Sequence, residues 1–412
     1  MSKEEKRAPE VRFEGFHDDW KQRKLGESLS ILKDGTHGTH KNVENGPHLL
    51  SAKNIKNGKI KVTEDDRKIS QKEYEQIHKN FQLKSGDILL TIVGSIGEAA
   101  VLQDPTGITF QRSVAYLRSS EIDTYFLYTL FIGPDFQKEL KNRQVVSAQP
   151  GIYLGDISKI IVKIPKGMKE QKQIGKFFKQ LNNAIALHQR KLDLLKEQKK
   201  GYLQKMFPKN GAKVPELRFA GFADAWEECK LGTIYDFGRG KGLPLASFIY
   251  SSDNPAIAYG HLYTKYPEVI SEVFWSSNDN GVLSKDNDLL FPGSSTVPNG
   301  TAQANAITLN NVKLGGDIII GRPKKGASVL STFMSYQVNS QRHKLFPITV
   351  GTTITHMYGK DISKLNFFVT DYSEQEKIAS FFTQLNTGID LHQIKLQNLQ
   401  TLKKSFLQKM FI

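Results

Sequence analysis

The stretch Gln171–Phe207, QKQIGKFFKQLNNAIALHQRKLDLLKEQKKGYLQKMF, recurs at Gln375–Phe411 with 21 of its 37 positions identical. In both copies apolar residues return at alternating steps of four and three, which is typical of the heptad seam of an amphipathic helix. At 1.5 Å per residue such a helix is a rod of about 55 Å. The seam comprises Ile174, Phe178, Leu181, Ile185, His188, Leu192 and Leu195 in the first copy, and Ile378, Phe382, Leu385, Ile389, His392, Leu396 and Leu399 in the second.

A seam of this length demands a partner, and the simplest one is the other copy. We therefore expect the two helices to pair antiparallel about a pseudo-two-fold axis, which would place whatever precedes each helix at opposite ends. His188 and His392 lie near the middle of their seams. They would be either polar residues that set the register or part of a solvated seam edge.

The duplication extends beyond the helices. Pro9–Gly26, PEVRFEGFHDDWKQRKLG, recurs as PELRFAGFADAWEECKLG at Pro215–Gly232, and Asp156-Ile-Ser-Lys159 recurs as Asp361-Ile-Ser-Lys364. Between these borders, residues from about 30 to 145 have no evident counterpart in those from about 235 to 350. A repeated framework with dissimilar contents indicates one scaffold that carries two different recognition surfaces. We divide the chain into a first module (1–165), a central helix (166–208), a second module (209–369) and a C-terminal helix (370–412).

Each module is expected to be a mixed α/β domain with a twisted, mostly antiparallel sheet. Short β-type runs separated by Gly-rich turns indicate the strands, and fewer stretches are helical. The expected strands lie around 87–93, 114–117, 288–291 and 317–320, and the expected helices around 72–78 and 125–142. The predicted fold class is α+β, with two such modules separated by the helix pair.

The composition favours a polyanionic partner. Lys and Arg number 57 against 42 Asp and Glu, which gives a net charge of +15. Nucleic acid is the leading candidate, although a ribosomal-type or membrane-surface protein would share this balance. A single cysteine, Cys229, excludes an intramolecular disulfide and a multi-Cys zinc site. The polar N-terminus and the lack of a long apolar run predict no membrane span and a cytoplasmic location.

Several loops suit contact with DNA, because Gly lets the backbone come close while basic and hydroxyl side chains reach phosphates and base edges. In the first module the candidate residues are Lys33, Thr36, His37, Thr39, His40, Ser95, Arg112 and Gln149. In the second they are Arg239, Lys241, Tyr259, His261, Tyr263, Lys265, Ser295, Arg322, Lys324 and Arg342.

Motifs of catalysis are missing from the sequence. Gly238-Arg-Gly-Lys-Gly242 lacks the spacing and hydroxyl of an ATP-binding phosphate loop. Pro134-Asp135 with Glu139-Leu-Lys141 resembles a metal-nuclease pattern, but the gap is too short and a helix start with Asp135 in its first turn explains it better. No amino-methyltransferase tetrapeptide is present. His37 and His40 lack a third ligand, so we expect no metal site and no catalytic residue in this chain.

The duplication, the Asp-Ile-Ser-Lys module ends and the Glu-Gln…Ile…Phe-Phe…Leu…Ile…Leu-His-Gln helix starts together resemble the specificity subunit of a bacterial type I restriction-modification system. The resemblance covers essentially the whole chain. It implies two target recognition domains that each read one half of a split DNA sequence, with the helix pair as a spacer between them. It also implies two modification subunits, which bind S-adenosylmethionine and methylate adenine, and two restriction subunits, which bring ATP and Mg²⁺ chemistry. This chain would then bind no cofactor itself.

Carried onto this sequence, the first module would read one half-site through 33–40 and 94–97, and the second would read the other through 238–242 and 259–266. The aromatic residues of the borders are assigned to docking each module against framework or partner; they are Phe13, Phe16 and Trp20 with their counterparts Phe219, Phe222 and Trp226. One alternative is a stand-alone tandem DNA-binding regulator or architectural protein. Another is a nuclease or methyltransferase with a diverged active site.

Overall fold

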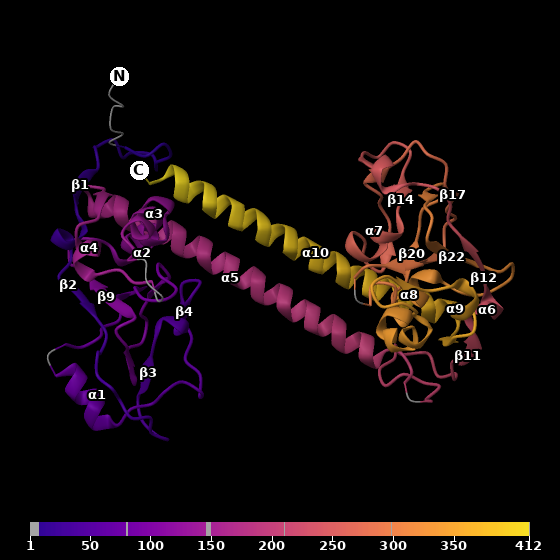
Figure 1. The fold of residues 1–412 in the computed structure, drawn as a ribbon, viewed down its shortest axis with the longest axis horizontal. Helices are drawn as coiled ribbons and strands as arrows, with labels where there is room; N and C mark the ends of the chain where they lie inside the picture. Colours follow the sequence, from indigo (N-terminus) through magenta and orange to yellow (C-terminus); the bar gives the residue numbers. More distant parts are fainter. Residues whose placement is uncertain (1–7, 80, 146–149, 210, 298, 412) are drawn as a thin grey trace. The chain divides into compact units, whose positions relative to one another are not determined.

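A computed structural model describes residues 8–79, 81–145, 150–209, 211–297 and 299–411. The chain forms two compact units, which are Met1–Gln189 with Ile394–Ile412 (unit 1) and Arg190–Gln393 (unit 2). The boundary falls inside the two long helices, α5 (Met168–Lys205) and α10 (Tyr372–Lys409), drawn in magenta and yellow in Figure 1. Each unit therefore contains one globular module and a part of each long helix.

Unit 1 is built on a four-stranded antiparallel sheet of order β2-β9-β6-β7. Its strands are β2 (Ile31–Asp34), β9 (Val114–Arg118), β6 (Ile88–Thr91) and β7 (Ala99–Val101). Three strand pairs flank it: β1 (Lys21–Lys24) with β10 (Ile161–Ile164), the parallel pair β3 (His48–Leu50) and β8 (Ile108–Phe110), and the hairpin β4 (Ile55–Lys56) and β5 (Lys59–Ile60). The helices are η1 (Leu25–Ser28), η2 (Ala52–Asn54), α1 (Gln71–His78), α2 (Thr124–Ile132), α3 (Pro134–Asn142) and α4 (Leu154–Ser158).

Unit 2 is built on a five-stranded sheet of order β12-β22-β18-β20-β15, antiparallel except for its last pair. Its strands are β12 (Tyr235–Arg239), β22 (Ile318–Pro323), β18 (Asp288–Pro292), β20 (Asn305–Ile307) and β15 (Val269–Ile270). The smaller sheets comprise β11 (Glu227–Lys230), β13 (Ile249–Tyr250), β14 (Ala256–Ile257), β16 (Trp275–Ser276), β17 (Val282–Leu283), β19 (Ser294–Ser295), β21 (Lys313–Leu314), β23 (Thr355–His356) and β24 (Asn366–Val369). The helices are α6 (Leu231–Ile234), α7 (Tyr259–Thr264), α8 (Ser331–Ser340), α9 (Gly359–Ile362) and the turns η3 (Leu245–Ser247), η4 (Arg342–Lys344) and η5 (Phe346–Ile348).

The expected strands of the modules and the helix around 72–78 are confirmed, whereas the helical stretch expected around 125–142 is divided at Gly133 into α2 and α3. The main sheet of each unit is buried on both faces. Successive side chains of a strand point to opposite faces. Leu90 of β6 therefore joins the core beside α2 and α5, whereas its neighbour Leu89 joins the core beside β3 and β8. Unit 2 repeats this arrangement with Leu289 and Leu290 of β18.

Some segments expected as loops are ordered instead. Residues 259–264 form the short helix α7, with Leu262 buried in the unit 2 core. Arg239 and Arg322 lie on the strands β12 and β22, Ser295 lies on β19, and Arg342 begins the turn η4.

The dissimilar interiors share a framework that the sequence comparison did not reveal. At the start of β6, Asp87 accepts hydrogen bonds from Nε and Nη2 of Arg118 on β9, at 2.5 and 2.7 Å. At the start of β18, Asp288 accepts the same pair from Arg322 on β22, at 2.9 and 2.8 Å. The two sheets also have the same strand order, because β2-β9-β6-β7 of unit 1 corresponds to β12-β22-β18-β20 of unit 2. The modules are therefore two versions of one fold, carrying different loops.

The long helices run antiparallel within each unit. In unit 1, Phe177 of α5 packs against Phe406 of α10 with ring centroids 5.1 Å apart, and in unit 2 Tyr202 packs against Phe381 at 5.0 Å. In an antiparallel helix pair, facing residues have numbers with a constant sum. The sum is 583 for both ring pairs, so α5 and α10 pair in the same register in each unit. All fourteen residues of the predicted seam are buried or half-buried.

The duplicated borders fix each module to the start of its helix. Glu170, in the first turn of α5, accepts hydrogen bonds from Arg12 at 2.6 Å and from the indole of Trp20 at 3.3 Å. Glu374 of α10 is bound in the same way by Arg218 at 2.6 Å and Trp226 at 3.1 Å. Three of the phenylalanines assigned to docking also contact the helices, since Phe13 packs on Phe177, Phe219 packs on Phe381, and Lys377 lies over the ring of Phe222.

Candidate nucleic-acid interface

Most of the candidate residues of unit 1 gather at one end of its sheet. In the antiparallel register Asp34 pairs with Ala115 and Thr91 with Val114, so β2 and β6 end where β7 and β9 begin. We call segments 35–47, 92–98 and 111–113 the unit 1 loop end. Thr36, His37, Thr39, His40, Ser95 and Arg112 all lie on it. Lys33 lies on β2 just before it, and Gln149 falls outside the described residues.

The start of the long loop after β2 is held in place by polar contacts. Nε2 of His40 lies 2.8 Å from Oγ1 of Thr36, and its Nδ1 lies 3.3 Å from Oε1 of Glu73 at the N-terminus of α1. Hydrogen bonds from Ser70, followed by those from His40, hold the pKa of Glu73 below its usual value, so this carboxylate is charged. His37 contacts Asp34 at 2.6 Å. Thr36 and His40 therefore shape the loop, whereas the side chains of His37 and Thr39 are exposed.

Unit 2 has a corresponding loop end, which comprises segments 240–255, 293–297, 299–304, 315–317 and 350–356. There Arg239, at the end of β12, forms an ion pair with Asp317. Asp317 also accepts a hydrogen bond from Ser294 at 3.1 Å, and Ser294 lies 3.0 Å from Nδ1 of His356. Asp317 adopts a left-handed backbone conformation with φ of 61°, which a non-glycine residue rarely adopts. One polar network thus joins the strand ends of unit 2.

The two loop ends are equivalent in their backbone contacts. Gly35 N donates to Val114 O and Thr36 N to Phe110 O, both at 2.9 Å. Gly240 N donates to Ile318 O at 2.8 Å and Lys241 N to Leu314 O at 3.2 Å. A Cβ atom on Gly35 would collide with Phe110 O, and one on Gly240 would collide with Gly315 O. The segments 33–40 and 238–242, predicted separately from their compositions, therefore occupy the same position in the two modules.

Other candidate residues of unit 2 have internal partners. Arg322 and Lys324 lie at the opposite end of the sheet, where Arg322 pairs with Asp288 and Lys324 donates to Gly232 O at 2.7 Å. Arg342 holds segment 299–304 in place by donating to Ala302 O and, at 2.8 Å, to Asn299 O, and burial lowers its pKa.

The hydroxyl of Ser295 is buried and bonds to the backbone of Val297 at 3.0 Å, so it stabilises a turn. On α7, His261 is buried among aromatic rings, Tyr259 and Tyr263 are half-buried, and Lys265 is exposed. Arg239, Lys241 and Lys265 are therefore the candidates of unit 2 that combine exposure with positive charge.

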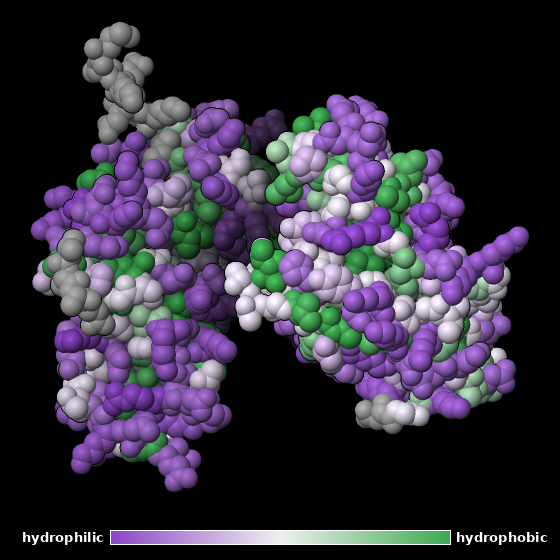
Figure 2. All heavy atoms as spheres, turned by 45° about the vertical axis from the view of Figure 1, so that its right-hand side comes forward, coloured by the Kyte–Doolittle hydropathy of each residue, from purple (hydrophilic) through white to green (hydrophobic). Residues whose placement is uncertain are grey.

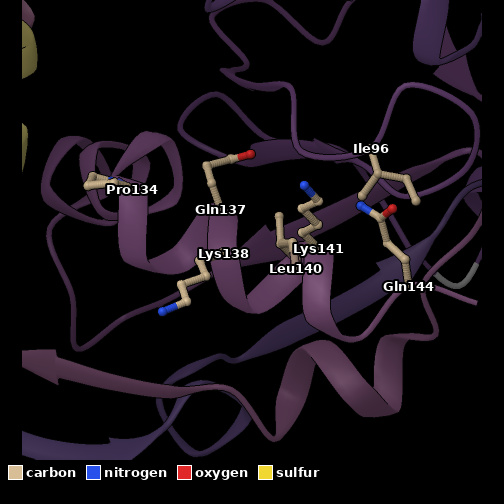
Figure 3. A pocket seen from close by; sticks show the side chains of 7 residues that line it. All are labelled: Ile96, Pro134, Gln137, Lys138, Leu140, Lys141 and Gln144. Atoms are coloured by element: carbon tan, nitrogen blue, oxygen red, sulfur yellow. The ribbon is translucent and has the colours of Figure 1, made fainter.

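A shallow hollow of about 530 Å³ adjoins the unit 1 loop end. It is lined by Ile96 and by residues of α3 and its C-terminal end: Pro134, Gln137, Lys138, Leu140, Lys141 and Gln144 (Figure 3). Gln137 donates to Gly97 O at 2.8 Å and so ties α3 to the turn between β6 and β7. α3 begins at Pro134 with Asp135 in its first turn, as the sequence predicted.

Sequence reasoning overlooked the acidic residues that orient the cations and histidines. Asp317 lies 78 positions from Arg239, and Glu73 lies 33 positions from His40. No local spacing connects such partners, because the fold alone brings them together. A search for basic and Gly-rich loops finds the cations and passes over these carboxylates.

The described part of the chain has neither a group of three or more metal-ligating side chains nor a helix long and apolar enough to cross a membrane. Hydrophilic side chains cover much of the face shown in Figure 2, with small apolar patches between them. The exposed side chains of the loop ends, such as His37, Arg112 and Lys241, offer hydrogen bonding and positive charge.

Comparison with known proteins identifies the family. The profile of the type I restriction modification DNA specificity domain matches residues 17–197 and 223–401. A putative type I restriction enzyme specificity subunit (MjaX) of Methanocaldococcus jannaschii is 21% identical over 403 residues, which cover 95% of this chain and 92% of the relative. The EcoBI specificity subunit of Escherichia coli is 25% identical over 185 residues, or 41% of this chain and 38% of the relative.

Among solved structures, the S subunit of a type I restriction-modification system from M. genitalium shares the fold. It aligns with a TM-score of 0.66 at 13% identity, over 98% of this chain and 99% of that one. The chain belongs to the family of type I restriction-modification specificity subunits and carries two copies of its DNA specificity domain.

Proposed function

We propose that each loop end reads one half of a bipartite target in double-stranded DNA, and that the chain directs methylation without catalysing it. The observation that carries this proposal is the equivalence of the two loop ends. The same framework presents His37, Thr39 and Arg112 in unit 1 but Arg239 and Lys241 in unit 2. Different side chains at equivalent positions are what two different half-sites require, because base edges are distinguished by their donor and acceptor patterns.

The catalytic groups would come from partner subunits in the cytoplasm. Two modification subunits would hold S-adenosylmethionine and methylate adenine, and two restriction subunits would supply ATP- and Mg²⁺-dependent chemistry. The uncompensated charge of +15 supports a polyanionic ligand for this chain itself. The absence of a phosphate loop and of a methyltransferase tetrapeptide from the sequence agrees with a recognition subunit.

Methylation-aware sequencing of cells that express the chain with its modification partner tests the proposal. Residues 30–145 are replaced by those of another family member, and in a second strain residues 235–350 are replaced. Each exchange should change one half of the methylated sequence and leave the other half and the spacing intact. A change in both halves after one exchange would refute independent reading. Recovery of the chain from cells without a modification subunit would instead favour a stand-alone DNA-binding protein.

The helix pair would set the gap between the half-sites. A heptad adds about 10.5 Å at 1.5 Å per residue, which corresponds to about three base pairs at 3.4 Å each. Inserting seven residues into α5 and seven into α10 should therefore lengthen the unspecified spacer by two or three base pairs with both half-sites unchanged. A methylome with the original spacing would contradict this role of the helices.

A further inference from the structure

Unit 1 carries a lysine-rich hairpin beside its loop end. The segment 53–61, KNIKNGKIK, contains four lysines and no acidic residue, and all four lysines are exposed. The strands β4 and β5 are joined by the two-residue turn Asn57-Gly58, whose φ angles of 52° and 75° give the twist that favours a tight hairpin. In the described part of unit 2, the chain after β14 instead forms α7, so the hairpin belongs to the first module.

The hairpin is held rigidly against the module. Its Ile55 is buried in the core beside β3 and β8, and Gly58 bridges to Ala100 on β7. Asn57 N donates to Glu98 at 2.8 Å. Gly58 adopts a φ that strains other residues, and a Cβ atom there would also have to displace the hydroxyl of Tyr128.

A buried carboxylate fixes the base of the hairpin. Asp66 accepts hydrogen bonds from the side chain of Asn54 at 2.9 Å and from Thr63 N at 2.8 Å, and it pairs with Lys53 at 2.9 Å. Burial opposes its ionisation, but the hydrogen bonds from Asn54, Lys53 and Thr63 outweigh burial and hold the pKa of Asp66 well below its ordinary value. The base of the hairpin is therefore ordered before any ligand arrives, which lowers the entropic cost of binding.

The outer face of the hairpin carries an uncompensated charge. Lys56 and Lys59 are directly paired across the two strands, and like charges at such positions destabilise a hairpin. Among the described residues no carboxylate forms an ion pair with Lys56, Lys59 or Lys61. Two half-buried cations of unit 1 do have such partners, since Arg23 pairs with Glu121 and Lys68 with Glu64. Because Lys56 and Lys59 repel each other and the hairpin holds them in place, an anion from outside the chain would relieve this repulsion.

The hairpin also continues the unit 1 loop end. Ala52 N, just before it, donates to the hydroxyl of Ser113 at 3.1 Å, and Ser113 directly follows Arg112. Its turn contacts Glu98, which closes the segment 92–98. A duplex contacted by Arg112 and Ser95 would therefore extend past the lysines, since a phosphate occurs every few ångströms along DNA.

We propose that the hairpin, through Lys56, Lys59 and Lys61, binds the phosphate backbone of double-stranded DNA beside the half-site of unit 1. This rests on the proposed function and adds to it a contact that supplies affinity and position without reading bases. Lysine suits this task because its ammonium group pairs with phosphate as a point charge on a flexible stem.

The test compares Lys56→Gln/Lys59→Gln with a control, Lys24→Gln/Lys84→Gln, which removes two exposed lysines outside the loop end. Each chain is purified with its modification subunit, and its Kd for a duplex carrying the methylated target is measured between 50 and 200 mM KCl. Each phosphate contact contributes about 0.9 to the slope of log affinity against log salt. Loss of two contacts should lower the slope by about 1.8, so the wild-type complex should lose roughly twelve-fold more affinity over this range than the hairpin variant.

The methylated sequence should be unchanged in the hairpin variant, and Lys56→Arg/Lys59→Arg should keep the wild-type slope. An equal slope in the hairpin variant and the control would overturn the proposal and leave the specificity function intact. A changed half-site would assign the hairpin to base reading, and loss of the modification subunit without a change in slope would assign it to a protein contact; either result overturns the backbone contact. A wild-type complex that neither binds nor methylates a defined sequence would refute the proposed function itself.

Discussion

Glu374 anchors unit 2 to α10, and its replacement by Gln should destabilise that unit by about 3–5 kcal/mol. Its side chain is fully buried, and that of Arg218 is 11% exposed. The hydrogen bonds that Arg218 donates to Glu374, followed by the negative charge of Glu374, hold the pKa of Arg218 above its ordinary value, so the guanidinium stays protonated. The amide of Gln still fills the space and accepts the indole hydrogen bond of Trp226, so the variant removes mainly the charge that compensates Arg218.

Hydrogen exchange followed by mass spectrometry measures this effect separately in the two units. In core strands of unit 2 such as β18 and β22, a loss of 3–5 kcal/mol corresponds to exchange roughly a hundred to several thousand times faster, at 1.4 kcal/mol per factor of ten. Glu170→Gln should act in the same way on unit 1, where Glu170 binds Arg12 and Trp20. The matched surface control is Glu216→Gln, which breaks the exposed pair with Lys209 and should cost no more than about 1 kcal/mol. If Glu374→Gln changed exchange no more than Glu216→Gln does, the buried ion pair would not anchor the module.

Two further predictions concern unit 2. Burial, followed by the charge of Lys265, lowers the pKa of His261 to about 4, from about 6.5 in an unfolded chain, so protonation favours unfolding. The stability of unit 2 should be fully present above pH 6.5 and fall by up to about 3 kcal/mol as the pH drops to 4, and His261→Gln should flatten this dependence in urea unfolding measured at a series of pH values. Gly240→Ala would place a methyl group against Gly315 O and should abolish methylation directed by the unit 2 half-site, whereas Gly238→Ala has open space and should leave it intact. Equal methylation by the two glycine variants, read by methylation-aware sequencing, would show that the close approach at Gly240 does not position the loop end.

The reach of sequence reasoning depended on how local each signal was. The seam from Ile174 to Leu195 was readable because a helix brings residues three and four apart onto one face. The border residues Trp20 and Trp226 were recognised as docking residues because they recur at a fixed offset within the duplication. The interior of the modules had no such signal. The ion pair Asp87–Arg118 corresponds to Asp288–Arg322 in the second module. Its two residues are 31 positions apart in the first module and 34 in the second, so no common spacing in the sequence reveals the correspondence.

In the candidate interface, too, local signals could be predicted from the sequence and contacts between distant residues could not. Composition pointed to 33–40 and 238–242 as DNA-contacting loops, but it also selected Arg322 and Arg342, because a cation in a polar stretch looks the same whether or not a carboxylate or carbonyl meets it in the fold. It passed over Lys56 and Lys59, which stand in a short run without the Gly-rich character of the other candidates. Exposure and ion pairing separate these classes, and both are properties of the packed chain.

By itself the amino-acid sequence determined that this protein is a duplication with two long amphipathic helices, since periodicity and internal repetition are written along one dimension. Only the tertiary structure decided that the dissimilar interiors are one fold, that strand ends bring 35–47, 92–98 and 111–113 together, and that a firmly held hairpin with two exposed lysines lies beside them. The physical reason is that successive turns of an antiparallel sheet lie alternately at its two ends, so loops from distant parts of the chain meet at the same end. Which residues meet there depends on strand order and register, and these are set by contacts between segments far apart in the chain.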